Sequence, residues 1–122
     1  MDDWRIEPLD ATHDRGTFHC GKASLDEFLR SLASQYEKRK LGRTFVGVLP
    51  TEKKVYGYYT LAAGSLPVHH LPPKAARKLP KHPIPVALLG RLAVDQAAHG
   101  RRLGAMLLFD ALKRCVALSA SV

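Results

Sequence analysis

The alternation of apolar and polar side chains along the chain predicts four strands. Residues 4–9 alternate large apolar with polar side chains and predict a short first strand that ends near Pro8. Residues 44–49 and 55–62 are rich in β-branched and aromatic side chains, and the turn between them predicts an antiparallel hairpin. The apolar stretch 86–94 predicts a buried central strand, in which Gly90 marks a bulge or a close backbone approach.

Two further stretches repeat apolar residues at the spacing of a helix. Ser24 and Glu27 form a capping-box pattern at the start of the first helix, and Gly42 is expected to stop it. The apolar face of this helix comprises Leu25, Phe28, Leu29, Leu32 and Tyr36. The second helix covers residues 100 to about 118 and places Leu103, Leu107, Ala111 and Cys115 on one face. The expected order is strand, helix, strand, strand, loop, strand, helix.

The segment 66–85 is expected to be a long functional loop inside one domain. It holds six of the eight prolines, which exclude regular structure beyond one short helical turn around residues 74–78. No acidic residue occurs between Glu52 and Asp95. The basic residues of that interval are Lys53, Lys54, Lys74, Arg77, Lys78, Lys81 and Arg91. The middle of the chain is therefore cationic.

The composition is that of one globular domain spanning residues 1–122. Of the 122 residues, 46% are hydrophobic and 25% are charged, so the chain can form a core without a disulfide or a metal. The net charge of +8 favours a polyanionic partner. Nucleic acid, an acidic protein and a phosphorylated cofactor all satisfy that requirement.

Cysteine spacing and hydropathy exclude several other classes of protein. Cys20 and Cys115 lie far apart without CxxC spacing, so neither a disulfide framework nor a zinc site is expected. The longest apolar run, residues 83–89, is too short to span a bilayer. Asp2 and Asp3 stand where a signal peptide would carry cations. We therefore expect a cytoplasmic protein that binds neither a metal nor a membrane.

The stretch 88–108 predicts an anion-binding site. A buried strand leads through a short polar loop into a helix whose first turn is rich in glycine and arginine. Gly100 and Gly104 leave room for a ligand beside the unpaired amides of the helix start. Arg101 and Arg102 add positive charge, so the site suits a pyrophosphate. The spacing fits neither a Walker motif nor the dinucleotide fingerprint GxGxxG.

This site resembles a known signature. The segment His99-Gly100-Arg101-Arg102-Leu103-Gly104 is similar to [QR]xxGx[GA], the acetyl-coenzyme A signature of the GCN5-related N-acetyltransferases (GNAT). His99 stands in place of the usual Gln or Arg, and Arg102 stands at the first glycine position. The Arg102 side chain would crowd one phosphate-facing amide, while its charge would compensate in part.

Wider blocks resemble one subfamily, the acetyltransferase toxins of bacterial type II toxin–antitoxin pairs. The blocks are residues 18–21 (FHCG), 44–46 (TFV), 57–61 (GYYTL), 64–66 (GSL), 84–86 (IPV) and 89–95 (LGRLAVD). The resemblance implies the α/β GNAT acyl-CoA N-acyltransferase fold, a mixed central sheet with helices on both faces. It also implies an acetyl-CoA-dependent enzyme that acetylates the amino group of aminoacyl-tRNA, inhibits translation and is neutralised by a ribbon-helix-helix antitoxin.

The resemblance also implies site residues. The acetyl-CoA site would comprise Leu92, Ala93, Val94, His99, Gly100, Arg101, Arg102, Leu103 and Gly104. Backbone amides near Ala93 and Val94 would polarise the thioester carbonyl. The tRNA substrate would contact basic residues, namely Arg91, Lys38, Arg39, Lys40, Arg43, Lys74, Arg77, Lys78 and Lys81. Each of these has an alternative interpretation: Arg91 as a cofactor-side or structural residue, and the others as solvated surface charges.

Family members continue with further strands and a helix that carries a tyrosine acting as general acid. We expect this chain to be a C-terminally truncated GNAT domain without that tyrosine, and to need a C-terminal complement for activity. A separate C-terminal fragment, a second copy forming a homodimer or an antitoxin segment would supply it. Tyr58 and Tyr59 are the candidates for a replacement acid, and one of them is expected to face the cleft. The alternative is a non-catalytic GNAT-like module that binds antitoxin or tRNA.

Overall fold

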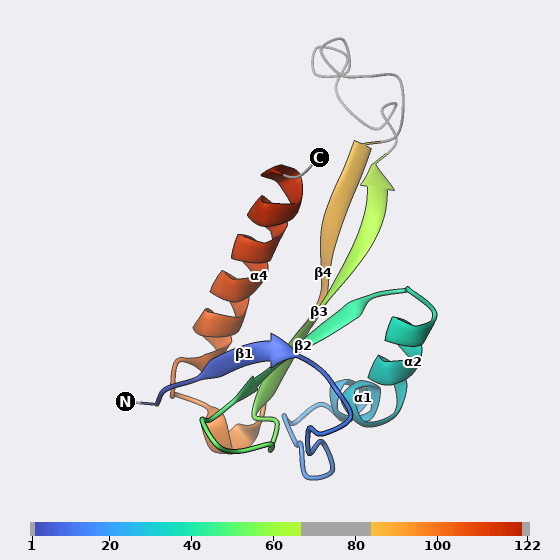
Figure 1. Cartoon of the computed structure of the whole chain (residues 1–122). Helices are drawn as coiled ribbons and strands as arrows, with labels where there is room; N and C mark the ends of the chain where they lie inside the picture. The colour runs from blue at the N-terminus through green and yellow to red at the C-terminus, as the bar shows by residue number, and fades with distance from the viewer. Residues whose placement is uncertain (1, 67–83, 121–122) are drawn as a thin grey trace.

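A computed structural model describes residues 2–66 and 84–120, with side chains of residues 65, 66, 84, 85 and 118–120 left aside. Four strands form one sheet in the order β1-β2-β3-β4, and every neighbouring pair is antiparallel (Figure 1). The strands are β1 (Arg5–Pro8), β2 (Arg43–Val48), β3 (Gly57–Leu66) and β4 (Ile84–Val94). The expected helical turn at residues 74–78 and the cations Lys74, Arg77, Lys78 and Lys81 lie outside the described residues.

Helices cover both faces of this sheet, as the sequence predicts. The first helical stretch comprises α1 (Ala23–Glu27), the π-helical η1 (Phe28–Leu32) and α2 (Ala33–Lys38). The short 3₁₀ helix η3 (Gln96–Ala98) precedes α4 (Leu103–Ala120), which lies on the other side of the strands (Figure 1). In the part of the chain with described structure, no helix is long and apolar enough to cross a membrane.

The ends of the first helical stretch differ from the prediction. Ser24 makes no capping hydrogen bond, and the N-cap is Lys22. The buried Asp26 carboxylate instead accepts from the Cys20 amide at 2.9 Å, because Asp26 lies in the first turn and can reach back to the preceding loop. The helix ends at Lys38, and Lys40, with a φ of 56°, forms a left-handed C-terminal turn two residues before Gly42. Both expected caps, Ser24 and Gly42, are therefore wrong.

Two core clusters lie on opposite faces of the sheet. On the α1–α2 face, the cluster includes Phe18, Phe28, Leu29, Val46 and Tyr58. On the α4 face, it includes Trp4, Phe45, Tyr59, Leu103, Leu107 and Ala111, with Cys115 partly buried against it. The predicted inward face of the second helix is confirmed. The two clusters meet only through the sheet, so the sheet backbone fixes the position of each helix relative to the other.

Two glycines determine how closely α4 approaches the sheet. Gly47 and Gly57 are directly paired across β2 and β3. A Cβ added at Gly47 would lie 2.8 Å from Leu103 Cδ1, and one at Gly57 would lie 2.9 Å from Leu107 Cδ1. Because the leucines pack directly on glycine backbone, the first two turns of α4 lie closer to the strands than side chains at these positions would allow.

The strand β4 is an edge strand among the described residues rather than a central one. Residues 87–90 are exposed, with Leu88 at 51% and Leu89 at 43%, so the expectation of a strand buried along its whole length is wrong. The expected bulge at Gly90 is confirmed, because the register with β3 shifts between Thr60 and Leu61 and leaves Gly90 without a partner. The expected open edge is also observed.

We expect Gly57→Ala to lower the free energy of unfolding by about 1–3 kcal/mol, because the added methyl overpacks the contact with Leu103 and Leu107. Urea unfolding followed by circular dichroism measures this change. Gly16→Ala is the matched control, since an added Cβ there meets its nearest atom at 3.5 Å and strains nothing. Equal stability of the two variants would contradict the close-packing argument.

Candidate functional site

The carboxyl end of β4 and the start of α4 together form the predicted anion site. The Asp95 amide donates to the Tyr56 carbonyl at 2.8 Å, which continues the β3–β4 ladder by one residue. Amides alternate in direction along an antiparallel ladder. The amides of Val94 and Leu92 therefore point to the outer edge of β4, whereas that of Ala93 points toward β3. Of the two amides predicted to polarise a carbonyl, the geometry favours Val94.

Side chains lock the turn between β4 and α4. The buried Asp95 carboxylate accepts from the His19 amide at 3.0 Å and from the Ala97 amide at 2.9 Å. The His99 ring bonds back to the Val94 carbonyl at 2.9 Å. His99, which stands in place of the signature Gln or Arg, thus closes the loop that joins strand and helix. These contacts hold the Val94 amide and the first turn of α4 in one arrangement.

The glycines and arginines of the turn have different roles. Gly100 has φ +77° and open space around it, so its backbone conformation is what requires glycine. Gly104 has ordinary φ, and an added Cβ would meet Val94 Cγ2 at 3.6 Å, an unstrained distance. Arg102 is exposed and has φ 67°, a conformation unfavourable for a residue with a Cβ. The signature carries glycine at this position, and the strained backbone gives the physical reason.

The Arg101 side chain pairs with the N-terminal segment of the chain. Its guanidinium donates to both carboxylate oxygens of Asp2 at 2.6 and 2.8 Å and lies 5.1 Å from the centre of the Trp4 ring. The Trp4 indole in turn donates to the Arg101 carbonyl at 2.9 Å. This pairing lowers the pKa of the Asp2 carboxyl. Arg101 fastens the N-terminal segment to the turn, so a pyrophosphate would have to compete with Asp2 for it.

Tyr58 and Tyr59 point to opposite faces of the sheet, as predicted, but both are fully buried and neither faces a cleft. The Tyr58 hydroxyl donates to the Leu25 carbonyl at 2.7 Å. The Tyr59 hydroxyl donates to Asp110, which also accepts from Arg114. Burial raises the pKa of both phenols well above the ordinary value. Helices cover both faces of β3, which is why the expectation that one tyrosine faces the cleft is wrong.

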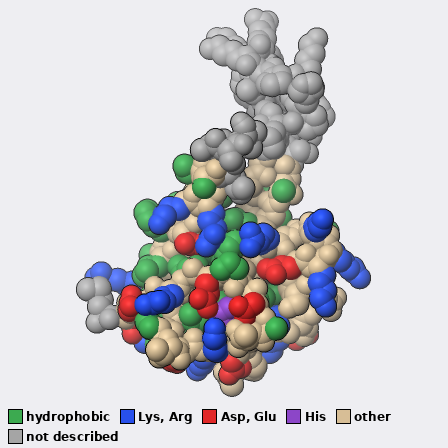
Figure 2. All heavy atoms as spheres, in the orientation of Figure 1, with side chains coloured by type: hydrophobic (Ala, Val, Ile, Leu, Met, Phe, Trp, Pro, Cys, Tyr) green, Lys and Arg blue, Asp and Glu red, His purple; other side chains and the backbone are tan. Residues whose placement is uncertain are grey.

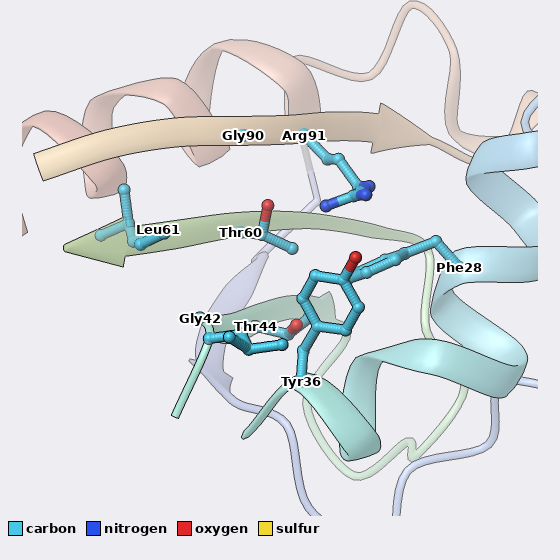
Figure 3. Close-up of a pocket in the computed structure, with 10 residues that line it drawn as sticks. Phe28, Tyr36, Gly42, Thr44, Thr60, Leu61, Gly90 and Arg91 are labelled. Atoms are coloured by element: carbon cyan, nitrogen blue, oxygen red, sulfur yellow. The ribbon is translucent and has the colours of Figure 1, made fainter. Parts of the chain in front are cut away.

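A second cluster lies on the α1–α2 face, around Arg91. Its guanidinium lies 3.7 Å from the centre of the Phe28 ring and 5.4 Å from that of Tyr36, and Figure 3 shows it pointing from β4 toward both rings. It forms no salt bridge with any carboxylate in residues 2–66 and 84–120. A pocket of about 70 Å³ opens beside it, lined also by Leu41, Gly42, Thr44, Thr60, Leu61, Ala62 and Gly90.

The pocket has a polar and an apolar part. Thr44 and Thr60 supply hydroxyls, while Leu41 and Ala62 supply apolar surface. Its volume is far below the roughly 300–1,000 Å³ of pockets that enclose a whole small ligand, so it suits the end of a larger molecule. The sequence alone did not reveal this pocket, because its residues come from five separate elements and one loop. The one visible signal was an arginine in an apolar run.

Four of the predicted basic residues are close in sequence to the lining of this pocket. Lys38, Arg39, Lys40 and Arg43 are all exposed at the end of α2 and the start of β2. They flank Leu41 and Gly42, which line the pocket. Figure 2 shows Lys and Arg side chains over the α2 end of the molecule as well as over other parts of the same face. Lys38, Arg39 and Lys40 thus directly precede pocket residues, whereas the Arg43 guanidinium lies 5.2 Å from the centre of the Phe45 ring, which belongs to the core of the opposite face.

Within residues 2–66 and 84–120, no group of three or more His, Cys, Asp or Glu side chains is placed to hold a metal ion.

Comparisons with known proteins give close similarities, although no family model matches the chain. A tRNA-acetylating toxin of Mycobacterium tuberculosis is 40% identical over 109 residues, which cover 89% of this chain. The solved structure of AtaT complexed with acetyl-methionyl-tRNAfMet has a TM-score of 0.80 at 36% identity and is matched over 98% of this chain and 71% of its own. A mutant AtaT toxin bound to the C-terminus of the antitoxin AtaR and acetyl-CoA has a TM-score of 0.80 at 31% identity, over 99% and 71% of the two chains. The chain spans 64% of the length of the curated Mycobacterium relative.

We expect Arg102→Gly to raise the melting temperature slightly. The left-handed conformation costs a residue with a Cβ about 1–2 kcal/mol. That cost exceeds the roughly 0.4–1 kcal/mol by which glycine lowers the free energy of unfolding through the greater conformational entropy of the unfolded chain. Differential scanning calorimetry measures the change. Arg101→Gly is the matched control and should lower the melting temperature, because it breaks the Asp2 and Trp4 contacts. A lower melting temperature for Arg102→Gly would overturn this interpretation.

Proposed function

The chain belongs to the family of GNAT toxins of bacterial toxin–antitoxin systems, and on that premise we propose that it acts as an acetyl-CoA-dependent N-acetyltransferase on the amino group of aminoacyl-tRNA. The GNAT fold expected from the sequence is confirmed by the solved structures. The observation that carries the proposal is 40% identity to a tRNA-acetylating toxin, combined with an outward-pointing amide at the end of β4 beside an open helix start.

The residues at the end of β4 fit acetyl-coenzyme A. The outward amides of Val94 and Leu92 can donate along the strand edge, and the first turn of α4 offers unpaired amides to phosphate oxygens. Gly104 keeps that first turn free of a side chain. Arg102 adds an exposed cation beside it, at the cost of crowding one amide. His99 would act by holding the loop rather than by contacting the ligand.

Acetyl-coenzyme A supplies the acetyl group as a thioester. The neutral amine of the aminoacyl ester attacks the thioester carbonyl carbon, the C–S bond breaks, and the coenzyme leaves as a thiol with the proton that the amine loses. The Val94 amide would stabilise the negative charge that develops on the carbonyl oxygen. No covalent intermediate with the protein is required. Neither Tyr58 nor Tyr59 is suited to supply the proton, because both hydroxyls are buried and donate within the core.

Charge supports RNA as the substrate. The chain carries a net charge of +8, and the exposed cations Lys38, Arg39, Lys40 and Arg43 lie close together in the sequence. Such a cluster suits a phosphate backbone. Aminoacyl-tRNA is made and used in the cytoplasm, which is where we place the protein. We also propose an antitoxin of the ribbon-helix-helix type as partner; the support is that the AtaT toxin binds the C-terminus of its antitoxin AtaR.

A non-catalytic module that keeps RNA or antitoxin binding is the alternative. It is favoured by one observation, the arginine at the first glycine position of the signature. Calorimetric titration with acetyl-coenzyme A separates the two, because the module would show no binding.

We expect Gly104→Val to weaken acetyl-coenzyme A binding tenfold or more, about 1.4 kcal/mol, since its side chain would occupy the space left for phosphates. The protein itself has room for a Cβ there, 3.6 Å from Val94, so the melting temperature should change little. Isothermal calorimetry and transfer of labelled acetyl to aminoacyl-tRNA measure both steps. Aminoacyl-tRNA with a blocked amine is the substrate control. Unchanged affinity in the folded variant would place the coenzyme elsewhere.

We expect the change of Lys38, Arg39, Lys40 and Arg43 together to Gln to flatten the salt dependence of tRNA binding. Each lost phosphate contact removes roughly 0.7–0.9 from the slope of log affinity against log salt concentration. Fluorescence anisotropy at several salt concentrations measures the slope. The control removes as many cations from other surfaces, namely Arg5, Lys53, Lys54 and Lys113. Equal slopes for both variants would show that the net charge of the chain, and not the position of these four cations, sets the salt dependence.

A further inference from the structure

We propose that Arg91 binds the last phosphodiester of the RNA acceptor end, as a positioning residue that sets where the amine lies. The inference rests on the proposed function and adds to it a defined contact with one phosphate. It is carried by the aromatic seat of the guanidinium, by its lack of a carboxylate partner among the described residues and by its place along β4.

The aromatic seat fixes the guanidinium in space. Phe28 and Tyr36 pack edge to face with ring centres 5.0 Å apart, and Arg91 lies over the Phe28 ring at 3.7 Å. Stacking uses the face of the guanidinium and leaves its in-plane N–H donors available. Those donors match two oxygens of one phosphate. The other arginines with polar contacts differ, because Arg15, Arg30, Arg101 and Arg114 all donate to groups of the protein.

The surroundings match a nucleotide end rather than a free anion. The pocket beside Arg91 combines the Thr44 and Thr60 hydroxyls with apolar surface from Leu41 and Ala62, in a volume of about 70 Å³. The exposed cations Lys38, Arg39 and Lys40 directly precede Leu41 and Gly42, which line the pocket. A phosphate backbone that follows these cations toward Gly42 would bring its end to the pocket, where Figure 3 shows Gly42 and Arg91.

The spacing along β4 matches the covalent structure of the substrate. Val94 lies three residues beyond Arg91, about 10 Å along an extended strand. In an aminoacyl-RNA, eight bonds separate the amino nitrogen from the phosphorus of the terminal nucleotide, a span of roughly 8–10 Å at ordinary bond lengths. The span from terminal phosphate to amine is therefore of the same order as the backbone spacing between Arg91 and Val94.

Arg91 is separate from the coenzyme's anion site. Its side chain packs with Phe28 and Tyr36 on the α1–α2 face, whereas Leu103 at the start of α4 belongs to the core of the opposite face. Among phosphate sources, the RNA end is thus favoured over the coenzyme pyrophosphate. Measurement of acetyl-coenzyme A affinity in an Arg91 variant distinguishes the two.

The test is a double-mutant cycle on binding, which needs no catalysis. The full chain and Arg91→Gln are titrated with an RNA minihelix ending in CCA, and with the same RNA carrying an uncharged methylphosphonate at its last linkage. We expect the wild-type chain to lose roughly 10-fold to 100-fold in affinity when that charge is removed. The affinity of Arg91→Gln for the normal RNA should be as low as that of the wild-type chain for the modified RNA. The affinity of Arg91→Gln should fall no further when the modified RNA replaces the normal one. Arg91→Lys keeps the charge without the fork and should recover part of the affinity.

Lys113→Gln is the matched control, because Lys113 also lies over an aromatic ring, 5.6 Å from the Phe109 centre, but on α4. Lys113→Gln should lose as much affinity as the wild-type chain when the modified RNA replaces the normal RNA. An equal loss for Arg91→Gln would overturn the assignment of Arg91, and so would weakened acetyl-coenzyme A binding in that variant. No binding of either RNA by the wild-type chain would overturn RNA recognition altogether. RNA binding with the expected cycle but no acetyl transfer would overturn only the proposed function.

Discussion

The close packing of α4 on Gly47 and Gly57 is the contact on which the arrangement of the site depends. These glycines are cross-strand partners, and Leu103 and Leu107 occupy the space that their side chains would take. This packing fixes the rotation of α4 about its axis and the distance of α4 from the sheet. Since Leu103 is also the first residue of α4, the same contact places the open amides of the helix start beside the end of β4. Packing and ligand geometry are therefore set by one pair of residues without side chains.

Local patterns predicted much of this fold because their physical cause is local. The period of α4, the hairpin and the bulge at Gly90 follow from side-chain spacing and backbone freedom within a few residues. The Arg101–Asp2 pair joins residues 99 positions apart, and no local pattern signals it. The two tyrosines alternate as expected, yet whether either meets solvent depended on helices contributed by distant segments. The first helical stretch ends in a left-handed turn at Lys40 where Gly42 was expected, and the Leu41 amide closes that turn by donating to the Tyr36 carbonyl at 2.8 Å.

The positive charge of the chain divides into structural and available parts. Arg15, Arg30, Arg101 and Arg114 satisfy carbonyls, carboxylates or a hydroxyl of the protein and so hold segments together. The exposed cations near residues 38–43 and Arg91, which lies over Phe28, form no such hydrogen bond or salt bridge through their side chains among the described groups.

The apolar surface of α4 likewise divides into a buried and an exposed part. Beside its buried stripe, α4 exposes Phe109 at 64%, Leu112 at 56% and Val116 at 69%, so this helix is apolar on more than one face (Figure 2). A helix of that kind is typical of one covered on two sides.

The bulge at Gly90 explains why Leu89 and Arg91, two residues apart on β4, lie on opposite faces of the sheet. Side chains alternate along a strand, so a shift of one residue exchanges their faces. Arg91 pairs with Thr60 and lies on the α1–α2 face, whereas Leu89, two residues earlier, pairs with Leu61, whose side chain belongs to the opposite core. Without the unpaired Gly90, Leu89 would share the face of Arg91 and its side chain would compete for the space beside the pocket. A larger residue at position 90 would meet the Thr60 hydroxyl at 3.0 Å from its Cβ. The bulge thus turns Arg91 toward Phe28 and Tyr36 and keeps the pocket beside it open, while the ladder resumes in time to direct the Val94 amide to the strand edge.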